Sequence, residues 1–507
     1  MSVTVRPSPG KPRRAKDKPF AVVDIGSNSV RLVVYERLCR APVPLFNEKS
    51  LCRLGAEVAA SGKLSASAVT STLKALQRFA HVAQAFEVGG IDVVATEAVR
   101  KARNGGDFLV AAEAAAGAPV QVLEGEEEAR TAATGVAYSF HRADGVVGDL
   151  GGGSIDLGFV TPKGASGPFG SLPLGTLVMG KALGSRAAEA PGIVKEALAG
   201  LPWLKGAARG KHFYVVGGGW RALGRVHEAM TDAPLRVVHD YRIPGPEAER
   251  LGRSIATLDQ ASLEALPGAP RRRVETLTAA SFLFAQIVGA LEPDEVVFSA
   301  FGLREGRLFD KLSPAELKRD PLLAATHDFG RSRVRMPGIA TAMQGWTAQL
   351  FPDETPAERR LRHAVCEISD SAWREHPGSR AREAFFRIAN YPWIGASHAE
   401  RAFLAYAIFI RYEGRPEDPF IKTIMTLVSE ADRRRAEILG SSLQLGYRLA
   451  AAVPDLLAGN RLDLSDGQLT LRLRSAALAP DDDILNQRLK GVARFAGAER
   501  FKVVADA

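Results

Sequence analysis

Two short segments of similar sequence contain the residues best suited to phosphate chemistry. Residues 24–29 read DIGSNS and residues 149–154 read DLGGGS, and each segment follows a strand-like run of apolar residues. Glycine permits tight turns and a close approach of ligand to backbone, while exposed N–H groups and serine hydroxyls bind phosphate oxygens. One such loop alone is more often only a turn. Two matching loops, each followed by another apolar strand, predict similar half-domains that face each other across a phosphate-binding cleft.

Carboxylates lie beside both loops. Asp24 and Asp149 end the strands before the loops, and Asp156 lies in the strand after the second loop. Hard carboxylate oxygens close to phosphate suit Mg²⁺, which usually takes one or two protein carboxylates. Side chains alternate between the faces of a strand, so Asp156 equally fits a solvent-facing position. We therefore expect a Mg²⁺ site at Asp149 and Asp24, with Asp156 as the weaker candidate and Mn²⁺ as an alternative metal.

A cluster of glutamates begins a predicted helix after another strand-like run, where residues 123–130 read LEGEEEAR. A carboxylate that projects into the cleft could orient a water molecule and accept its proton, as a general base does. Acidic residues in the first turn of a helix also stabilise the helix dipole. The pattern leaves both interpretations open for each glutamate.

Basic residues follow several strand-like runs. Arg100 and Arg304 fit strand-end loops, where arginine clamps phosphate through paired hydrogen bonds, although surface exposure is the commoner role of arginine. The run Arg271–Arg273 fits a solvated surface or the edge of a longer groove for a polyanion. These residues are candidates for neutralising phosphate charge.

Of two further glycine motifs, one fits a phosphate-binding loop and the other does not. Gly217–Gly219 follows a strand-like run and fits a third phosphate loop or a tight turn. Residues 175–181 read GTLVMGK, but Ala182 stands where a nucleotide-binding P-loop needs a hydroxyl for magnesium. The P-loop interpretation of that segment is therefore rejected.

The elements that must position these residues alternate between short strands and longer helices. Strands are predicted at 20–24, 91–95, 120–123, 146–149, 213–216 and 296–298, which is typical of an α/β fold. After Ser313-Pro314 the pattern becomes helical, and near the C-terminus a strand hairpin is predicted around Asp466-Gly467. We predict a basic arm over 1–18, half-domains over 19–138 and 139–312, a helical domain over 313–455 and a small α/β domain over 456–507.

Composition limits the class of protein. The 507 residues are 46% hydrophobic and 24% charged, as in ordinary globular proteins, and 66 Lys and Arg against 57 Asp and Glu give a net charge of +9. That charge favours a polyanionic ligand. Three cysteines without a CxxC pair indicate a reducing, cytoplasmic location, and the basic N-terminal residues do not resemble a signal peptide. No stretch approaches the roughly 20 apolar residues of a membrane span, so we expect no membrane contact.

Six motifs taken together resemble the exopolyphosphatase/guanosine pentaphosphate phosphohydrolase family. They are residues 22–34, 95–105, 123–130, 148–158, 215–225 and 301–308. The resemblance implies a duplicated actin-like, ribonuclease-H-like fold. It also implies Mg²⁺-dependent removal of terminal phosphate from inorganic polyphosphate, or of the 5′ γ-phosphate from guanosine pentaphosphate.

The resemblance implies roles for single residues. Glu127, the first glutamate of EEAR, would be the water-activating base, Arg100 would neutralise substrate charge, and Asp149 with Asp24 and Asp156 would surround the metal. Together with the loops and arginines above, it gives a set of predicted phosphate-binding residues. These are Ser27, Asn28, Ser29, Gly151, Gly152, Gly153, Ser154, Gly218, Gly219, Arg273 and Arg304.

The sequence departs from the family pattern in three places. Asp156 stands where many relatives have Glu, and Trp220 stands where many have a hydroxyl residue. The helical domain resembles a degenerate HD fold, in which Ser369-Asp370 occupies the place of the His-Asp pair. We therefore expect no second metal site there. The histidines of that domain, His363, His376 and His398, are expected to be packing or surface groups.

Several functions fit these features. We expect an exopolyphosphatase, and guanosine pentaphosphate hydrolysis would use the same residues. A non-catalytic sensor of polyphosphate or alarmone is the alternative from another class, and a kinase or ATPase of the same fold would consume ATP. The expected partners are inorganic polyphosphate, guanosine penta- or tetraphosphate and a second copy of the chain, while nucleic acid is not expected.

Overall fold

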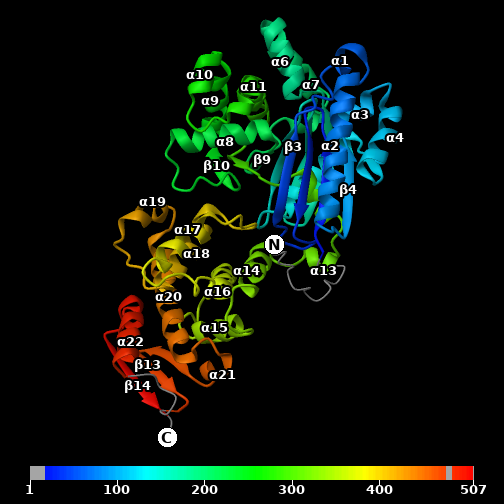
Figure 1. Ribbon diagram of the computed structural model, residues 1–507. Coiled ribbons are helices and arrows are strands. Elements are labelled where there is room, and N and C mark those ends of the chain that lie inside the picture. Colours follow the sequence, from blue (N-terminus) through cyan, green and yellow to red (C-terminus); the bar gives the residue numbers. More distant parts are fainter. Residues whose placement is uncertain (1–17, 476–481, 506–507) are drawn as a thin grey trace. The chain divides into compact units, whose positions relative to one another are not determined.

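The computed structural model describes residues 18–475 and 482–505, which form two compact units, coloured blue to green and yellow-green to red in Figure 1. Unit 1 contains the described residues up to Asp232 together with Val238–Lys318. Unit 2 contains Ala233–Val237 together with the described residues from Arg319 onward. All but the last residue of the predicted arm, 1–18, lies outside the described residues.

Unit 1 contains two sheets that share an arrangement of five strands, to which the second sheet adds the edge strand β10. The first has the order β3 (Pro44–Ser50), β2 (Val30–Tyr35), β1 (Phe20–Ile25), β4 (Gly90–Ala95), β5 (Val120–Val122). The second has the order β8 (Gly164–Leu172), β7 (Ile155–Thr161), β6 (Gly145–Leu150), β9 (His212–Val216), β11 (Glu295–Phe298), β10 (Tyr241–Pro244). In each sheet three antiparallel strands precede a parallel pairing. The repeat predicted from the two loops is therefore a repeat of whole sheets.

The strands that the sequence did not predict are β3, β8 and β10, and each lies at the edge of its sheet. An edge strand contacts only one neighbour, so it needs fewer apolar residues and tolerates proline and glycine. β3 begins at Pro44, and β8 has the sequence GASGPFGSL. Strands of this composition are missed when strands are predicted from runs of apolar residues.

The helices of unit 1 are α1 (Val58–Ser61), α2 (Ala66–Ala85), α3 (Glu97–Lys101), α4 (Gly105–Ala116), α5 (Gly125–Ala137), α6 (Thr176–Ser185), α7 (Ala190–Ala199), α8 (Gly218–Met230), α9 (Gly245–Ala256), α10 (Gln260–Ala265), α11 (Val274–Leu291), α12 (Leu303–Phe309) and α13 (Pro314–Leu317). Two of these helices pack against the sheet of the other half. α5 follows the first sheet in the chain, yet Ala133 and Val136 pack against β6 and β7 of the second. α12 follows the second sheet, yet Leu308 packs with Phe20 of the first.

Residues Arg271–Leu291 form a helix long and apolar enough to cross a membrane by length and composition alone. This corrects the expectation that no stretch approaches such a length. Side chains of α11, among them Leu277, Leu283 and Phe284, are buried in the core of the second half. The helix is therefore accounted for as a core helix of unit 1.

Unit 2 is helical and ends in a small sheet. Its helices are α14 (Pro321–Arg331), α15 (Ile339–Ala348), α16 (Pro356–Ile368), α17 (Arg380–Asn390), α18 (His398–Arg411), α19 (Lys422–Met425), α20 (Glu430–Ala450), α21 (Pro454–Leu457) and α22 (Asp482–Ala496). The sheet has the order β12 (Arg461–Ser465), β13 (Gln468–Leu473), β14 (Arg500–Ala505). Its hairpin turns at Asp466 and Gly467, both with positive φ, as the sequence predicted.

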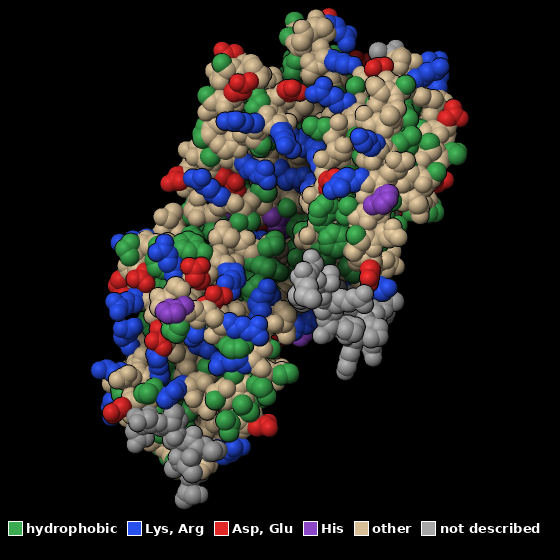
Figure 2. Space-filling view, in the orientation of Figure 1, with side chains coloured by type: hydrophobic (Ala, Val, Ile, Leu, Met, Phe, Trp, Pro, Cys, Tyr) green, Lys and Arg blue, Asp and Glu red, His purple; other side chains and the backbone are tan. Residues whose placement is uncertain are grey.

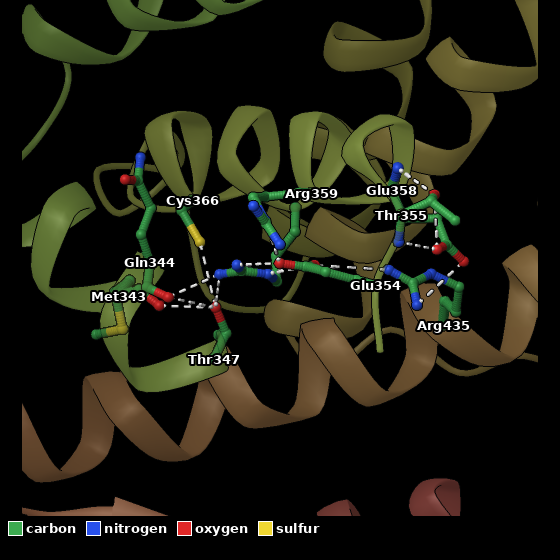
Figure 3. A network of polar contacts seen from close by, with 10 residues as sticks. Met343, Gln344, Thr347, Glu354, Thr355, Glu358, Arg359, Cys366 and Arg435 are labelled. Atoms are coloured by element: carbon green, nitrogen blue, oxygen red, sulfur yellow. Dashed lines mark hydrogen bonds and ion pairs between the residues drawn. The ribbon is translucent and has the colours of Figure 1, made fainter. Parts of the chain in front are cut away.

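A buried ionic network holds the helices of unit 2 together (Figure 3). The side chains of Arg362 and Glu354 are each only 4% exposed and form an ion pair of 2.5 Å. Arg362 also donates to the Gln344 carbonyl at 2.7 Å and to Thr347 Oγ1 at 3.1 Å, which ties α16 to α15. Arg435 of α20 pairs with Glu358 at 3.3 Å. Because both charges of the central pair are buried and compensated, removal of either partner would leave an unpaired buried charge and destabilise unit 2.

The Ser369-Asp370 pair lies at the end of α16. Asp370 is fully buried and forms an ion pair of 2.7 Å with Arg335, and Ser369 Oγ lies 2.9 Å from the Tyr447 hydroxyl. His398 Nε2 lies 2.8 Å from the Val237 carbonyl, and His363 is partly buried. The Asp370 carboxylate is thus neutralised by an arginine, which leaves it unsuited to a metal.

Candidate active site

The two glycine loops border one cavity of about 150 Å³ in unit 1. Figure 2 shows Lys and Arg side chains gathered where the surface of this unit is hollowed. The loops also approach each other, because a Cβ on Gly152 would lie 3.3 Å from Asn28 Cβ. The predicted phosphate-binding residues that line the cavity are Ser27, Asn28, Ser29, Gly151, Gly152, Gly153, Ser154, Gly218, Gly219, Arg273 and Arg304. The structure therefore brings this whole set together.

The same backbone turn shapes both loops. Gly26 N–H donates to the Ser29 carbonyl at 3.1 Å, and Gly151 N–H donates to the Ser154 carbonyl at 2.9 Å. In the first loop, the Ser27 carbonyl accepts from Gly55 N–H at 2.8 Å. The loops are thus held by backbone contacts that do not depend on a ligand.

The segment rejected as a P-loop supports the second loop instead. The amides of Gly175, Thr176 and Leu177, at the start of α6, donate to the carbonyls of residues 153, 151 and 152 at 2.9, 3.1 and 2.9 Å. The C=O and N–H of a trans peptide point in opposite directions. The N–H groups of residues 152–154 therefore point away from α6. A Cβ on Gly175 would lie only 2.2 Å from the Gly152 carbonyl carbon, so glycine is required for this approach.

Five cationic side chains line the cavity, namely Arg31, Lys49, Arg221, Arg273 and Arg304. Burial and neighbouring arginines lower the pKa of Lys49 to about 8 and that of Arg221 to about 9. Such crowding of like charges is unfavourable without an anion. The cavity is therefore electrostatically suited to a polyanion.

Three of these cations were not predicted from the sequence. Arg221 lies two residues after the third glycine loop, within the motif at residues 215–225, and donates to the Ser299 and Ala300 carbonyls at 3.2 and 3.3 Å. Arg31 lies opposite Asp24 on the neighbouring strand, a placement that strand register gives once the hairpin is assumed. Lys49 lies on β3, which the sequence did not reveal.

The three predicted metal carboxylates all line the cavity but differ in environment. Asp24 forms an ion pair of 3.2 Å with Arg304, and burial nevertheless raises its pKa. Asp149 and Asp156 lie opposite each other on β6 and β7. Burial, together with like charges that include Asp24 for Asp149 and Asp149 for Asp156, raises the pKa of Asp149 to about 6 and that of Asp156 to about 7. Asp156 is buried, so the solvent-facing alternative is excluded.

The donor set was tested against Mg²⁺. No group of three or more His, Cys, Asp or Glu among the described residues is placed to hold a metal, so Asp24, Asp149 and Asp156 do not converge as a trio. Mg²⁺ needs only one or two protein carboxylates and completes its shell with waters and phosphate oxygens. Asp156 Oδ1 is buried without a hydrogen-bond partner among the described residues. Asp149 and Asp156 therefore fit Mg²⁺, whereas Asp24 is already paired with arginine.

The glutamate that reaches the cavity is Glu128, not Glu127. The Glu127 carboxylate accepts from the Gln121 side chain at 2.8 Å and does not line the cavity, which corrects the expectation that it projects into the cleft. Consecutive helical residues point about 100° apart, so neighbouring glutamates cannot share one direction. Burial and Asp156 raise the pKa of Glu128 well above its usual value. Its buried Oε2 has no hydrogen-bond partner among the described residues.

Arg100 lies beside Glu128 rather than on the cavity wall. Its guanidinium lies 3.7 Å from Glu128 Oε2 and 3.9 Å from Glu124 Oε2, and it donates to the Leu123 carbonyl. Arg100 therefore contacts carboxylates in this structure, and its expected role in neutralising substrate charge stays a prediction. Arg100 lowers the pKa of Glu128 against the effect of burial and so favours its charged form.

The third glycine loop lies at the start of α8. Gly217 has φ +99°, and a Cβ on Gly218 would lie 2.2 Å from an Arg273 Nη atom. Trp220 is fully buried, donates to the Ala280 carbonyl at 3.1 Å and contacts the Phe213 ring. Its place in the family motif is therefore a packing position, while Gly218 and Gly219 face the cavity.

The chain is similar to several proteins of known structure. An exopolyphosphatase-like protein of known structure is 22% identical, with a TM-score of 0.51 over 58% of this chain and 98% of its own. An exopolyphosphatase from Cytophaga hutchinsonii is 19% identical, with a TM-score of 0.50 over 58% of this chain and 99% of its own. The PPX-GPPA enzyme of Aquifex aeolicus is 24% identical, with a TM-score of 0.49 over 58% and 99% of the two chains.

The matches with the exopolyphosphatase-like protein and the Cytophaga hutchinsonii enzyme confirm the predicted duplicated actin-like α/β fold, and unit 2 is the predicted helical domain. Residues 322–504 match the sequence profile described as exopolyphosphatase, C-terminal. Residues 32–315, more than half of the chain, match that of the Ppx/GppA phosphatase family. The chain belongs to the Ppx/GppA phosphatase family.

Proposed function

We propose that this protein is an exopolyphosphatase that uses Mg²⁺ to hydrolyse the terminal phosphate of inorganic polyphosphate. The observation that carries the proposal is the Glu128 carboxylate, whose buried Oε2 has no hydrogen-bond partner among the described residues, in a cavity lined by glycine loops, five cations and three aspartates. Phosphoryl transfer to water needs positioning and charge neutralisation more than a protein nucleophile. The net charge of +9 favours a long polyanion over a small neutral substrate.

In the proposed reaction the two glycine loops hold the terminal phosphates through backbone N–H groups and serine hydroxyls. Arg221, Arg273 and Arg304 neutralise the equatorial oxygens and hold the terminal phosphorus in line with the attacking water. Glu128 accepts a proton from that water as its oxygen bonds to phosphorus. The bridging P–O bond breaks, and the electron pair leaves on the shortened chain.

The metal would be held by Asp149 and Asp156, with phosphate oxygens completing its coordination. When bound, Mg²⁺ supplies positive charge that stabilises the phosphate oxygens of the transition state. Arg100 positions the Glu128 carboxylate and opposes the rise in its pKa that burial and Asp156 cause.

The test compares consecutive glutamates of one helix. Phosphate release from long-chain polyphosphate with Mg²⁺ would be measured for the parent protein and for Glu128→Gln, Glu127→Gln and the exposed control Glu126→Gln. We expect a 10²- to 10⁴-fold loss for Glu128→Gln, which is roughly the contribution of a general base. A comparable loss in Glu127→Gln alone would return the role to Glu127.

Guanosine pentaphosphate and ATP would be assayed in parallel. Release from guanosine pentaphosphate but not from polyphosphate would place the protein with guanosine pentaphosphate phosphohydrolases. Tight binding of either substrate without turnover by the parent protein would replace the proposal with a sensor function.

A further inference from the structure

Unit 2 contains a second cavity of about 470 Å³, lined entirely by residues 377–420. It lies where the segment leading into α17 meets the loop after α18. Four arginines contribute to its wall, namely Arg380, Arg382, Arg411 and Arg415. Nothing in the proposed hydrolysis uses these residues.

Arg411 is the unusual member of this group. It is only 8% exposed, and its guanidinium lies 4.6 Å from the ring centre of Tyr412 and 4.0 Å from that of Tyr447. Its Nε is buried without a hydrogen-bond partner among the described residues. A buried charge is costly unless it is paired, and two aromatic rings supply only part of the required compensation.

The other charges around the cavity leave a positive excess. Arg380 donates to the backbone carbonyls of Trp373 and Glu375, which are uncharged and do not neutralise its positive charge. Arg382 lies 5.0 Å from the Phe420 ring centre. Glu413, one of the two lining carboxylates, is paired with Arg488, which leaves the Asp418 carboxylate facing four arginines.

We propose that this cavity binds a phosphate group, with Arg411 as its buried anchor. A phosphate dianion would supply the missing charge, and the planar fork of a guanidinium matches two phosphate oxygens. Arg382 and Arg415 are placed to contact the outer oxygens. The ligand is either free orthophosphate or one unit of a phosphate chain. The choice of these two ligands rests on the proposed function, but the binding of phosphate by the cavity does not.

Equilibrium dialysis of the full chain against radiolabelled orthophosphate, and separately against labelled long-chain polyphosphate, would test the proposal in the presence of EDTA, which prevents hydrolysis. For orthophosphate, we expect the parent protein to bind one more equivalent than Arg411→Gln does. Arg434→Gln, an exposed arginine of the same unit outside the cavity, should bind as the parent does. Equal stoichiometry in Arg411→Gln and the parent for both ligands would overturn the proposal.

Two further variants keep the result interpretable. If Arg411→Gln fails to fold, the exposed Arg382→Gln should still weaken this site by about 10-fold, the loss of one charge-assisted contact. Glu128→Gln should retain the site even when hydrolysis is lost, so failure of the two proposals can be distinguished. A difference between Arg411→Gln and the parent for polyphosphate alone would identify a chain unit as the ligand, and a difference for orthophosphate would identify the free ion.

Discussion

The two hairpins at the centre of unit 1 have the same backbone turn but differ in the charged residue that lies opposite the aspartate. In the first, Asp24 lies opposite Arg31 and is paired with Arg304, so each negative charge has a positive neighbour. In the second, the equivalent Asp149 lies opposite Asp156, so two carboxylates adjoin, of which Asp156 is buried. The repeat thus provides the same backbone turn twice, while the side chains place an arginine opposite one aspartate and a second carboxylate opposite the other. Only the second hairpin brings two carboxylates together for a bound cation.

The largest expected effect separates the equivalent aspartates. Asp149→Asn should lower polyphosphate hydrolysis by about 1,000-fold and raise the Mg²⁺ concentration needed for half-maximal rate, because charge stabilisation by a bound cation is worth several kcal/mol. Asp24→Asn should change the KM for polyphosphate and leave the Mg²⁺ midpoint unaltered. Titrations of rate with Mg²⁺ check both variants. Equal shifts of the Mg²⁺ midpoint would contradict the division of roles between the hairpins.

The next effect concerns pH and stability without metal. Asp149 and Asp156 bind protons more readily in the folded protein than in the unfolded chain, since their pKa values rise from 3.8 to about 6 and about 7. Their contribution to stability is therefore fully present below pH 4 and is lost as pH rises to about 7. Asp156→Asn removes one of these carboxylates. The free energy of unfolding should therefore rise relative to the parent protein by roughly 2–4 kcal/mol at pH 8 and change little at pH 4.

Urea unfolding of the parent protein and of Asp156→Asn in EDTA, at pH 4, 6 and 8, measures the difference in their free energies of unfolding. Asp24→Asn is the control from the first hairpin, where burial also raises the pKa of the aspartate but the ion pair with Arg304 opposes that rise. Its effect on the free energy of unfolding should therefore change less between pH 4 and pH 8 than the effect of Asp156→Asn. An equal pH dependence of the two variants would show that the two hairpins are electrostatically alike.

The smallest effect tests the support of the second loop. Gly175→Ala places a methyl group against the backbone of Gly152, and overpacking of this kind costs about 1–3 kcal/mol. We expect polyphosphate KM to rise roughly 10-fold as the loop shifts, since 1.4 kcal/mol corresponds to that factor. Gly180→Ala, in the same helix with no atom within 4 Å of the added Cβ, is the matched control. Unchanged kinetics in Gly175→Ala would mean that α6 does not hold the loop.

The sequence predicted the central strands well because buried strands are continuous apolar runs. β1, β4, β6, β9 and β11 all lie where these runs occur. The edge strands could not be found in this way, since β3 and β8 are half-exposed and interrupted by proline or glycine. Lys49 was missed as a direct consequence, because its strand was missed.

The candidate site was predictable at the level of loops but less so at the level of single side chains. Glycine loops have fixed sequence signatures, and their residues all line the cavity. Which of Glu126, Glu127 and Glu128 points inward depends on where the helix starts and how it is rotated about its axis. A run of identical residues does not indicate that rotation. The ion pair of Asp24 is formed with Arg304, which is 280 residues away in the chain, so the residues around Asp24 give no local sign of it.

The crossing of α5 and α12 between the sheets bears on how this protein could be divided or recombined. A fragment ending near residue 138 would carry α5 with Ala133 and Val136 exposed, while the remaining fragment would lack the helix that covers its sheet. Although each half repeats the other's strand order, neither is a self-sufficient module, and complementation requires both fragments together. Glu128 and Arg304, one on each exchanged helix, would then become functional only upon reassembly.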